Sequence, residues 1–230
     1  MTKPDAVAQP WVAFFYSVVL EPQRRMKSVD LLEIARVARL ARARTVLSTG
    51  NLIGWARGDE RDLERRLERA AEAVVGKRIP VFCRSVPDFR RIVVSNPLDL
   101  QTTPHAGEVA VRVMRAVPPP DVIKRIASKA ERGERFGAHE RTLWVAASGQ
   151  LSESRLMRAV NAAWAGEGTT RSLSALGKIG AAIDSIRPRA SFERGDQRVH
   201  QALRRGPVAV ELGIEDGDLQ ARGLRGGGRG

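Results

Sequence analysis

The feature that most constrains the fold is an alternation of short apolar segments with segments of helical periodicity, which runs twice along the chain. In the first half, the apolar segments have the length of strands, and the segments between them carry apolar residues at helical spacing. The expected strands are Trp11–Leu20, Val46–Trp55 and Ile79–Arg84, and the expected helices begin at Ser28, Asp59 and Ser85. The order of elements in this half is therefore β-α-β-α-β-α.

The helix that follows Asp59 has the clearest boundaries. Asp59 is a favoured N-cap residue, Leu63 and Leu67 begin an apolar stripe, and Gly76 is a favoured terminator. Arginine and glutamate also alternate at a spacing of three residues along this helix. The pairs are Arg61/Glu64, Arg65/Glu68 and Arg69/Glu72. Such pairs are typical of a solvent-exposed face on which the charges neutralise one another.

The second half repeats this style. The expected strands are Glu108–Val117 and Arg141–Ala147, and the expected helices are Asp121–Ala130, Ser154–Ala165 and Arg171–Ile183, with a turn at Gly166–Gly168. Short strands separated by helices, without a glycine-rich first turn, favour two α+β units over a Rossmann sheet. We therefore expect two α+β subdomains, at residues 11–97 and 98–183.

The two ends of the chain differ from this pattern. Residues 1–10 form a polar leader, and residues 184–230 carry scattered arginine, glycine and proline with few large apolar residues. Such a composition buries little apolar surface, so we expect the basic tail to be largely flexible.

Cysteine and histidine usage points to a reducing compartment. Cys83 is the single cysteine, so the chain cannot form an intrachain disulfide, and the three histidines are far apart in sequence. His139-Glu140 begins like a zinc-protease helix, but Leu143 occupies the position of the second histidine. We expect no metal site, no cofactor and a cytoplasmic location.

The apolar run Trp11–Leu20 is too short to cross a bilayer, since a span needs about 18 residues. No basic n-region or small-residue cleavage site accompanies it. We therefore expect a buried strand and no membrane partner.

The charge balance is the strongest functional signal. The chain has 39 basic and 26 acidic residues, a net charge of +13. Such an excess favours nucleic acid or another polyanion as a partner. An alternative is compositional: arginine supplies 33 of the 39 basic residues, alanine and glycine are abundant, and this bias is also typical of GC-rich coding.

One region concentrates this charge. The candidate polyanion patch comprises Arg24, Arg25, Arg36, Arg39, Arg42 and Arg44. A phosphate backbone would be attracted to such a cluster. Aromatic residues make up only 5% of the chain, so recognition by base stacking, as in an RRM, is disfavoured.

A second candidate site lies where a turn is expected to enter the last helix. Thr169, Thr170 and Arg171 could hold an anion there, because a helix start offers free N–H groups and arginine offers a fork of donors. Lys178 would add a supporting charge, and Asn51 is a further candidate. The alternative is an ordinary helix cap.

Four segments, in order, resemble a known family. They are Val46-Leu-Ser-Thr-Gly-Asn-Leu-Ile53, Ser95-Asn-Pro-Leu98, Ser154-Arg-Leu156 and Thr169-Thr-Arg-Ser-Leu-Ser-Ala-Leu-Gly-Lys178. They are similar to the Ser-Gly-Asn strand, the Asn-Pro-Phe, the Ser-Lys-Leu and the Thr-Arg-Asn-Trp plus Thr-Val-x-Lys signatures of the bacterial family domain of unknown function 1697.

The resemblance covers about residues 11–183. It implies two ferredoxin-like halves with antiparallel sheets, and no established activity. The chain departs from the family after the first strand, where Tyr16-Ser-Val-Val-Leu-Glu-Pro22 replaces Arg-Gly-Ile-Asn-Val-Gly-Gly, and in the late motif, at Ser172 and Leu173.

No recognised catalytic motif assigns a reaction: G-x-S-x-G, the P-loop pattern and G-x-G-x-x-G are all missing. Two function classes remain. The first is a basic module that binds nucleic acid or another polyanion. The second is a small-ligand protein or enzyme that acts on a phosphorylated or anionic substrate.

Overall fold

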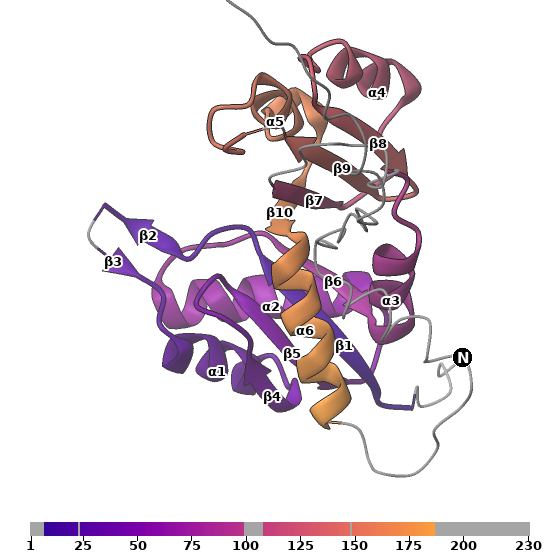
Figure 1. The fold of residues 1–230 in the computed structure, drawn as a ribbon. Coiled ribbons are helices and arrows are strands. Elements are labelled where there is room, and N and C mark those ends of the chain that lie inside the picture. The colour runs from indigo at the N-terminus through magenta and orange to yellow at the C-terminus, as the bar shows by residue number, and fades with distance from the viewer. Residues whose placement is uncertain (1–6, 23, 99–107, 148, 187–230) are drawn as a thin grey trace, which may run out of the picture.

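Each half of the chain builds a four-stranded antiparallel sheet in the computed structural model, which describes residues 7–22, 24–98, 108–147 and 149–186 (Figure 1). The N-terminal sheet has the strand order β4-β5-β1-β6 and is covered by two helices. Its elements are β1 (Gln9–Phe15), α1 (Ser28–Val37), β4 (Ala41–Thr45), β5 (Asn51–Ala56), α2 (Glu60–Val75) and β6 (Val81–Ser85). We call this βαββαβ arrangement the N-terminal unit. A small hairpin, β2 (Val19–Glu21) and β3 (Arg24–Arg25), projects between β1 and α1 (Figure 1).

The C-terminal unit repeats the same topology, with the strand order β10-β7-β9-β8. Its elements are β7 (Glu108–Met114), α4 (Pro120–Ala127), β8 (Arg135–His139), β9 (Thr142–Ala147), α5 (Arg155–Val160), the 3₁₀ turn η1 (Ala163–Ala165) and β10 (Gly168–Ser172). Both sheets are antiparallel throughout. The α+β class with ferredoxin-like halves, predicted from the sequence, is thus confirmed.

Two further helices lie between the units and complete the core. They are α3 (Val86–Val94), which follows β6, and α6 (Leu173–Ile186), which follows β10. A central apolar cluster joins the sheet faces that α1, α2, α4 and α5 leave uncovered, with Phe14 from β1, Trp144 from β9, Phe89 from α3 and Ile179 from α6. Neither sheet therefore presents a bare face.

Helix starts follow the sequence signals more closely than helix ends: the helix expected over Ser154–Ala165 ends at Val160, and the 3₁₀ turn η1 follows at Ala163. The Asp59 side chain accepts a hydrogen bond from the Asp62 N–H at the start of α2, and Gly76 ends that helix with φ 74°. Ser85 and Ser154 cap α3 and α5 in the same way. None of the described helices is long and apolar enough to cross a membrane.

Two strand predictions need correction, and β4 and β8 were not predicted. The segment Val46–Trp55 is not one strand: it contains a turn with left-handed φ at Leu47 (61°) and Gly50 (78°), and β5 begins only at Asn51. β1 ends at Phe15, so Trp11–Leu20 is also split. Residues 1–6 of the leader and 187–230 of the basic tail lie outside the described residues. Gln9 and Pro10 of the expected leader begin β1, and residues 184–186 of the expected tail end α6.

The last helix begins later than predicted. Residues Gly168–Ser172 form β10, an edge strand paired with β7, and α6 starts at Leu173. Pairing with β7 satisfies backbone groups that a helix start would have left free. Thr169, Thr170 and Arg171 are therefore strand residues and do not form the first turn of a helix.

Candidate functional site

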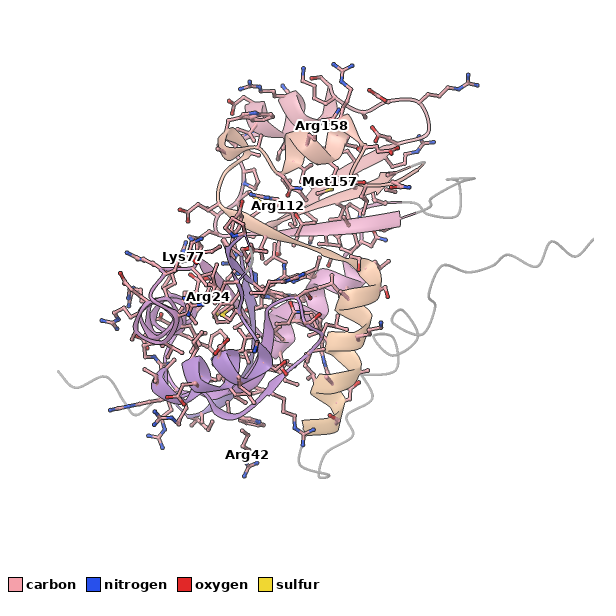
Figure 2. All side chains as sticks on the ribbon, turned by 90° about the vertical axis from the view of Figure 1, so that its left-hand side faces the viewer. Arg24, Arg42, Lys77, Arg112, Met157 and Arg158 are labelled. Carbon is pink, nitrogen blue, oxygen red and sulfur yellow. The ribbon has the colours of Figure 1, made fainter. Side chains whose placement is uncertain are left out.

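The six arginines of the polyanion patch are all exposed, and they fall into two groups. Arg24 and Arg25 lie on β3, before α1, whereas Arg39, Arg42 and Arg44 follow α1. α1 has 10 residues, so the groups are separated by a helix about 15 Å long. Figure 2 shows Arg24 and Arg42 at different levels of the N-terminal unit.

Arg36 lies on α1 between the two groups and is already paired. Its Nε and Nη2 donate to the Glu33 carboxylate at 2.8 and 2.6 Å. For the other five patch arginines, no carboxylate of the described chain lies within ion-pair distance. Their charge is therefore available to an external anion.

Two of these arginines have unusual backbone geometry. Arg39 and Arg42 adopt left-handed φ angles of 58° and 51°. The pairing of β4 with β5 shifts register between Ala41 and Arg44, as at a bulge. Because β4 is an edge strand, the charges and the bulge also hinder pairing with a foreign strand.

Arg171 is buried, and it reaches from β10 into the N-terminal unit. Its Nε donates to Asn51 Oδ1 at 2.6 Å, and its Nη2 donates to the carbonyls of Phe15 and Gly50 at 2.7 and 3.2 Å. Its Nη1 donates to Thr169 Oγ1 and to the Thr170 carbonyl, both at 2.8 Å. All five guanidinium N–H groups thus have partners within the chain. Burial lowers the pKa of Arg171 to about 10.

Asn51 completes this junction from the other side. It is fully buried, and its Nδ2 donates to the Val46 carbonyl and to Thr49 Oγ1 at 2.9 and 3.0 Å. Asn51 therefore shapes the hairpin turn and orients the Arg171 guanidinium. Asn51 belongs to the segment Val46–Ile53 and Arg171 to the segment Thr169–Lys178. Two of the four segments that resemble the family are therefore in direct contact here.

The remaining residues of the predicted anion site do not gather with Arg171. Thr170 lies on the opposite face of β10, since side chains alternate along a strand, and its Oγ1 donates to Asn161 Oδ1 at 2.8 Å. Lys178 is exposed on α6. The structure thus unites Asn51, Thr169 and Arg171 in a buried junction, and the anion-site hypothesis remains a prediction.

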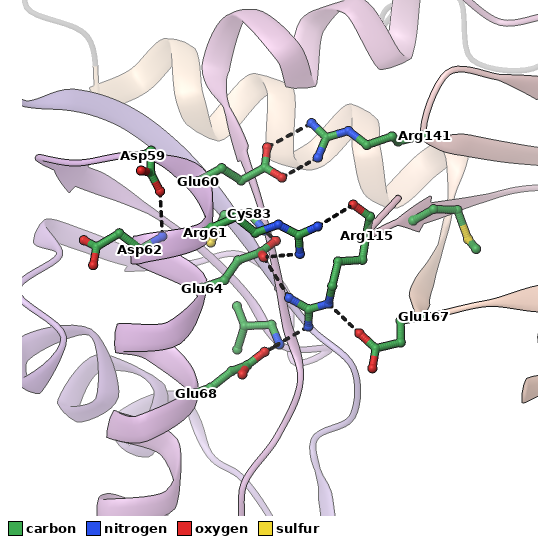
Figure 3. Close-up of polar contacts among 12 residues, drawn as sticks. Asp59, Glu60, Arg61, Asp62, Glu64, Glu68, Cys83, Arg115, Arg141 and Glu167 are labelled. Atoms are coloured by element: carbon green, nitrogen blue, oxygen red, sulfur yellow. Dashed lines mark hydrogen bonds and ion pairs between the residues drawn. The ribbon is translucent and has the colours of Figure 1, made fainter. Parts of the chain in front are cut away.

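A second polar centre, which the sequence did not reveal, runs along α2 (Figure 3). Glu60, Glu64 and Glu68 follow one another at single-turn spacing on the side of α2 that faces β6. Glu64 accepts from the Cys83 N–H at 3.0 Å, and Glu68 accepts from the Val81 N–H at 3.2 Å. β6 is an edge strand, paired on one side with β1. The two carboxylates bind N–H groups on its other side. The expectation that Glu64 and Glu68 lie on a solvated face is therefore wrong: they are 1% and 6% exposed.

Arginines from the C-terminal unit bind the same glutamates. Arg115 donates to Glu64 at 2.7 Å, to Glu68 at 2.9 Å and to Glu167 at 2.5 Å (Figure 3). Arg141 forms a two-pronged pair with Glu60. The guanidinium of Arg115 also lies 4.8 Å from the ring centre of Phe82. The row of glutamates thus joins the two units.

The pKa values of Glu64 and Glu68 are shifted in opposite directions. Burial raises the pKa of Glu64, although the Cys83 N–H and Arg115 oppose it. Burial also acts to raise the pKa of Glu68, but hydrogen bonds from the Val81 N–H, Arg115 and Arg78 outweigh it and leave that pKa lowered.

A cleft of about 540 Å³ opens over this row of glutamates. Its lining comprises Arg61, Glu64, Arg65, Glu68, Arg78, Pro80, Arg115 and Glu167. In the sequence, this cleft is indicated only by the single-turn spacing of Glu60, Glu64 and Glu68, which lie beside the apolar stripe of α2. Within the part of the chain that the structure describes, no group of histidine, cysteine and acidic residues could hold a metal ion.

Comparison with known proteins places the chain in a family. Residues 9–144, more than half of the chain, match the protein family of unknown function DUF1697. The chain belongs to the DUF1697 family. The match includes β1, the α2 glutamates and most of the C-terminal sheet. The late motif with Arg171 lies beyond it.

A solved structure shares the fold of this DUF1697 protein. It is the conserved bacterial protein SP0830 from Streptococcus pneumoniae, with a TM-score of 0.61, 13% sequence identity, and coverage of 77% of this chain and 99% of that one. At this identity the likeness concerns the fold alone. No curated protein matches the chain.

Proposed function

We propose that this DUF1697 protein is a basic module that binds nucleic acid or another polyanion through the patch arginines at the two ends of α1. The observation that carries the proposal is the set of exposed arginines without a carboxylate partner in the described chain. They are Arg24, Arg25, Arg39, Arg42 and Arg44. Side chains of this kind release counterions when they contact a phosphate backbone.

The layout of the core favours backbone contact over base stacking. In RNA-binding ferredoxin-like folds, aromatic residues on the open sheet face stack on bases. In this protein the corresponding faces are packed against α3, α6 and each other, with Phe14 and Trp144 fully buried. The peripheral arginines are therefore the surface that we assign to a polyanion.

The spacing of the two arginine groups suits a duplex. The helix α1 that lies between them is about 15 Å long, which is comparable with the width of the B-DNA major groove, about 12 Å. Arg24 and Arg25 would contact one strand, and Arg39, Arg42 and Arg44 the other. Such contacts are independent of base sequence.

The test measures the binding of the full chain to a labelled DNA duplex by fluorescence anisotropy at several salt concentrations. Five phosphate contacts predict a log–log slope of about −4.5. The triple variant Arg39→Gln/Arg42→Gln/Arg44→Gln should flatten the slope by about 2.7 units, since three contacts are lost. Arg132→Gln, which alters an exposed arginine of the C-terminal unit, serves as the control.

Two outcomes would refute the proposal. One is undetectable binding to duplex DNA or RNA at about 50 mM salt, where electrostatic binding is strong. The other is a slope in the triple variant that matches that of the Arg132→Gln control. The basic composition would then have no role in binding at this surface.

The cleft of about 540 Å³ between the units supports a second candidate function, the binding of a small anionic ligand. This volume falls within the range of about 300–1,000 Å³ that is typical of small-molecule sites. The lining is charged, so its ligand would itself be strongly charged.

A further inference from the structure

The cleft over α2 combines residues from both units. Arg61 and Arg65 come from α2, Arg78 precedes β6, and Arg115 and Glu167 come from the C-terminal unit. Four arginines and three glutamates line it, so its charge is positive on balance.

The acidic groups on the floor of the cleft are neutralised within the chain. Glu64 uses one oxygen for the Cys83 N–H and the other for Arg61 and Arg115. Glu68 binds the Val81 N–H and Arg115 through one oxygen, and Arg78 through the other. These carboxylates therefore repel an incoming anion much less than free ones would.

The arginines at the mouth of the cleft keep unused donors. Arg65 makes no hydrogen bond within the described chain, its nearest carboxylate oxygen is 3.8 Å away on Asp62, and its side chain is 63% exposed. Arg78 is 68% exposed and has a single contact of 3.2 Å, with Glu68. Arg61 uses two donors, for Glu64 and for the Arg115 carbonyl, both at 3.2 Å. A guanidinium has five N–H donors, so most donors in this trio are free.

We propose that this cleft is a binding site for a compact polyphosphate, either free or carried by a nucleotide. Arg61 and Arg65 are one helical turn apart and so project side by side, while Arg78 approaches from the start of β6. Guanidinium groups bind phosphate oxygens with two parallel hydrogen bonds. Three such groups around one cleft match a ligand with two or three linked phosphates better than a single phosphate.

This site is separate from the arginine patch at the ends of α1 and uses none of its residues. A ligand held by Arg65 and Arg78 would lie against Arg115 and Glu167, and would therefore contact both units. Binding is expected to stabilise their arrangement, because a ligand that binds only the folded state raises its stability.

The test is a calorimetric titration of the full chain with inorganic pyrophosphate and, separately, with ATP. We expect saturable binding to the wild-type protein. The double variant Arg65→Gln/Arg78→Gln should bind at least about tenfold more weakly, because it loses charge-assisted hydrogen bonds. Arg69→Gln, which alters an exposed arginine one turn further along α2, is the matched control and should bind normally. Circular dichroism checks that each variant is folded.

The two ligands distinguish the two sources of the polyphosphate. Tighter binding of pyrophosphate indicates a free polyphosphate, and tighter binding of ATP indicates a nucleotide. The Arg39→Gln/Arg42→Gln/Arg44→Gln variant should bind both as the wild type does. Loss of pyrophosphate binding in that variant would move the site to the patch and overturn the proposal. Absence of saturable binding, equal affinity in the double variant, or equal affinity for sulfate would overturn it as well.

Discussion

Asn51 Oδ1 accepts a hydrogen bond from Arg171 Nε at 2.6 Å, across 120 residues of sequence. The bond joins the first residue of β5 to the last strand of the C-terminal unit. Because the Arg171 guanidinium also binds the Phe15 and Gly50 carbonyls, it ties β1 and the β4–β5 turn to β10. Arg171 therefore holds the two units together from the inside.

Replacement of Arg171 by methionine should destabilise the protein by about 3 kcal/mol or more. The variant leaves the buried Asn51 Oδ1 without a donor, which costs about 1–3 kcal/mol. It also removes the charge-assisted hydrogen bonds to the Phe15 and Gly50 carbonyls, which keep only Thr169 Oγ1 (3.4 Å) and the Phe15 N–H (2.8 Å) as donors. Urea denaturation measures the change. Lys178→Met is the control, since Lys178 is exposed on α6, and a similar loss in both variants would contradict the assigned role.

Arg115 should be, with Arg171, an arginine on which the stability of the interface between the units depends. Its side chain is 20% exposed and binds three glutamates. Arg115→Gln leaves Glu64 and Glu68 without this partner, and the loss of one member of a buried charge network costs about 3–5 kcal/mol. Arg65→Gln removes an exposed charge and should cost about 0–1 kcal/mol. Equal effects in denaturant titrations would contradict the network.

Glu68 should make part of the stability pH-dependent. Its pKa is lowered in the folded protein, so its contribution to stability is present above the ordinary carboxyl pKa of 4.5 and is lost as the pH falls through the lower folded value. Glu68→Gln should therefore be destabilising at pH 7, and the difference from the wild type should shrink below pH 4.5. Glu72→Gln, on the exposed side of α2, is the matched control. Denaturant titrations at pH 7 and pH 3.5 check this.

Gly168 is required for the packing of β10 against β7. A Cβ at this position would lie 2.7 Å from Met114 Sδ, 2.8 Å from the Val113 carbonyl and 2.9 Å from Arg112 Nε. Gly168→Ala should therefore destabilise the protein by about 1–3 kcal/mol through overpacking. Gly149→Ala is the control, because nothing lies within 4 Å of its Cβ. A thermal unfolding midpoint unchanged in Gly168→Ala would contradict the close contact.

The sequence predicts helices better than strands in this protein. α2 was bounded correctly because Asp59 and Gly76 are local signals that act through their own backbone neighbours. β10 was missed because its buried side chains, Thr169 and Arg171, are polar and are satisfied only by partners far away in the chain. The turn before β5 was missed although Ser48, Thr49 and Gly50 are typical turn residues, because apolar residues lie on both sides of them.

The same distinction applies to the candidate sites. The exposed patch arginines all lie between Arg24 and Arg44, so their concentration is visible in the sequence. The cleft could not be predicted, since Arg115 meets Glu64 across 51 residues and Glu68 across 47. Periodicity placed the glutamates on one side of α2 but could not show which arginines bind them.

The position of α6 has a consequence for synthesis on the ribosome. The sheet face of the N-terminal unit that carries Val12, Phe14 and Ile53 is packed in part against Leu176, Ile179 and Ile183 of α6. The sheet is complete once β6 ends at Ser85, and α6 ends at Ile186. At about 5–20 residues per second, the roughly 100 residues between them take about 5–20 s to translate. During that interval the nascent chain presents an apolar sheet face that its own last helix has yet to cover. An apolar face that remains uncovered for this interval is exposed to non-native contacts until the C-terminal unit has been translated.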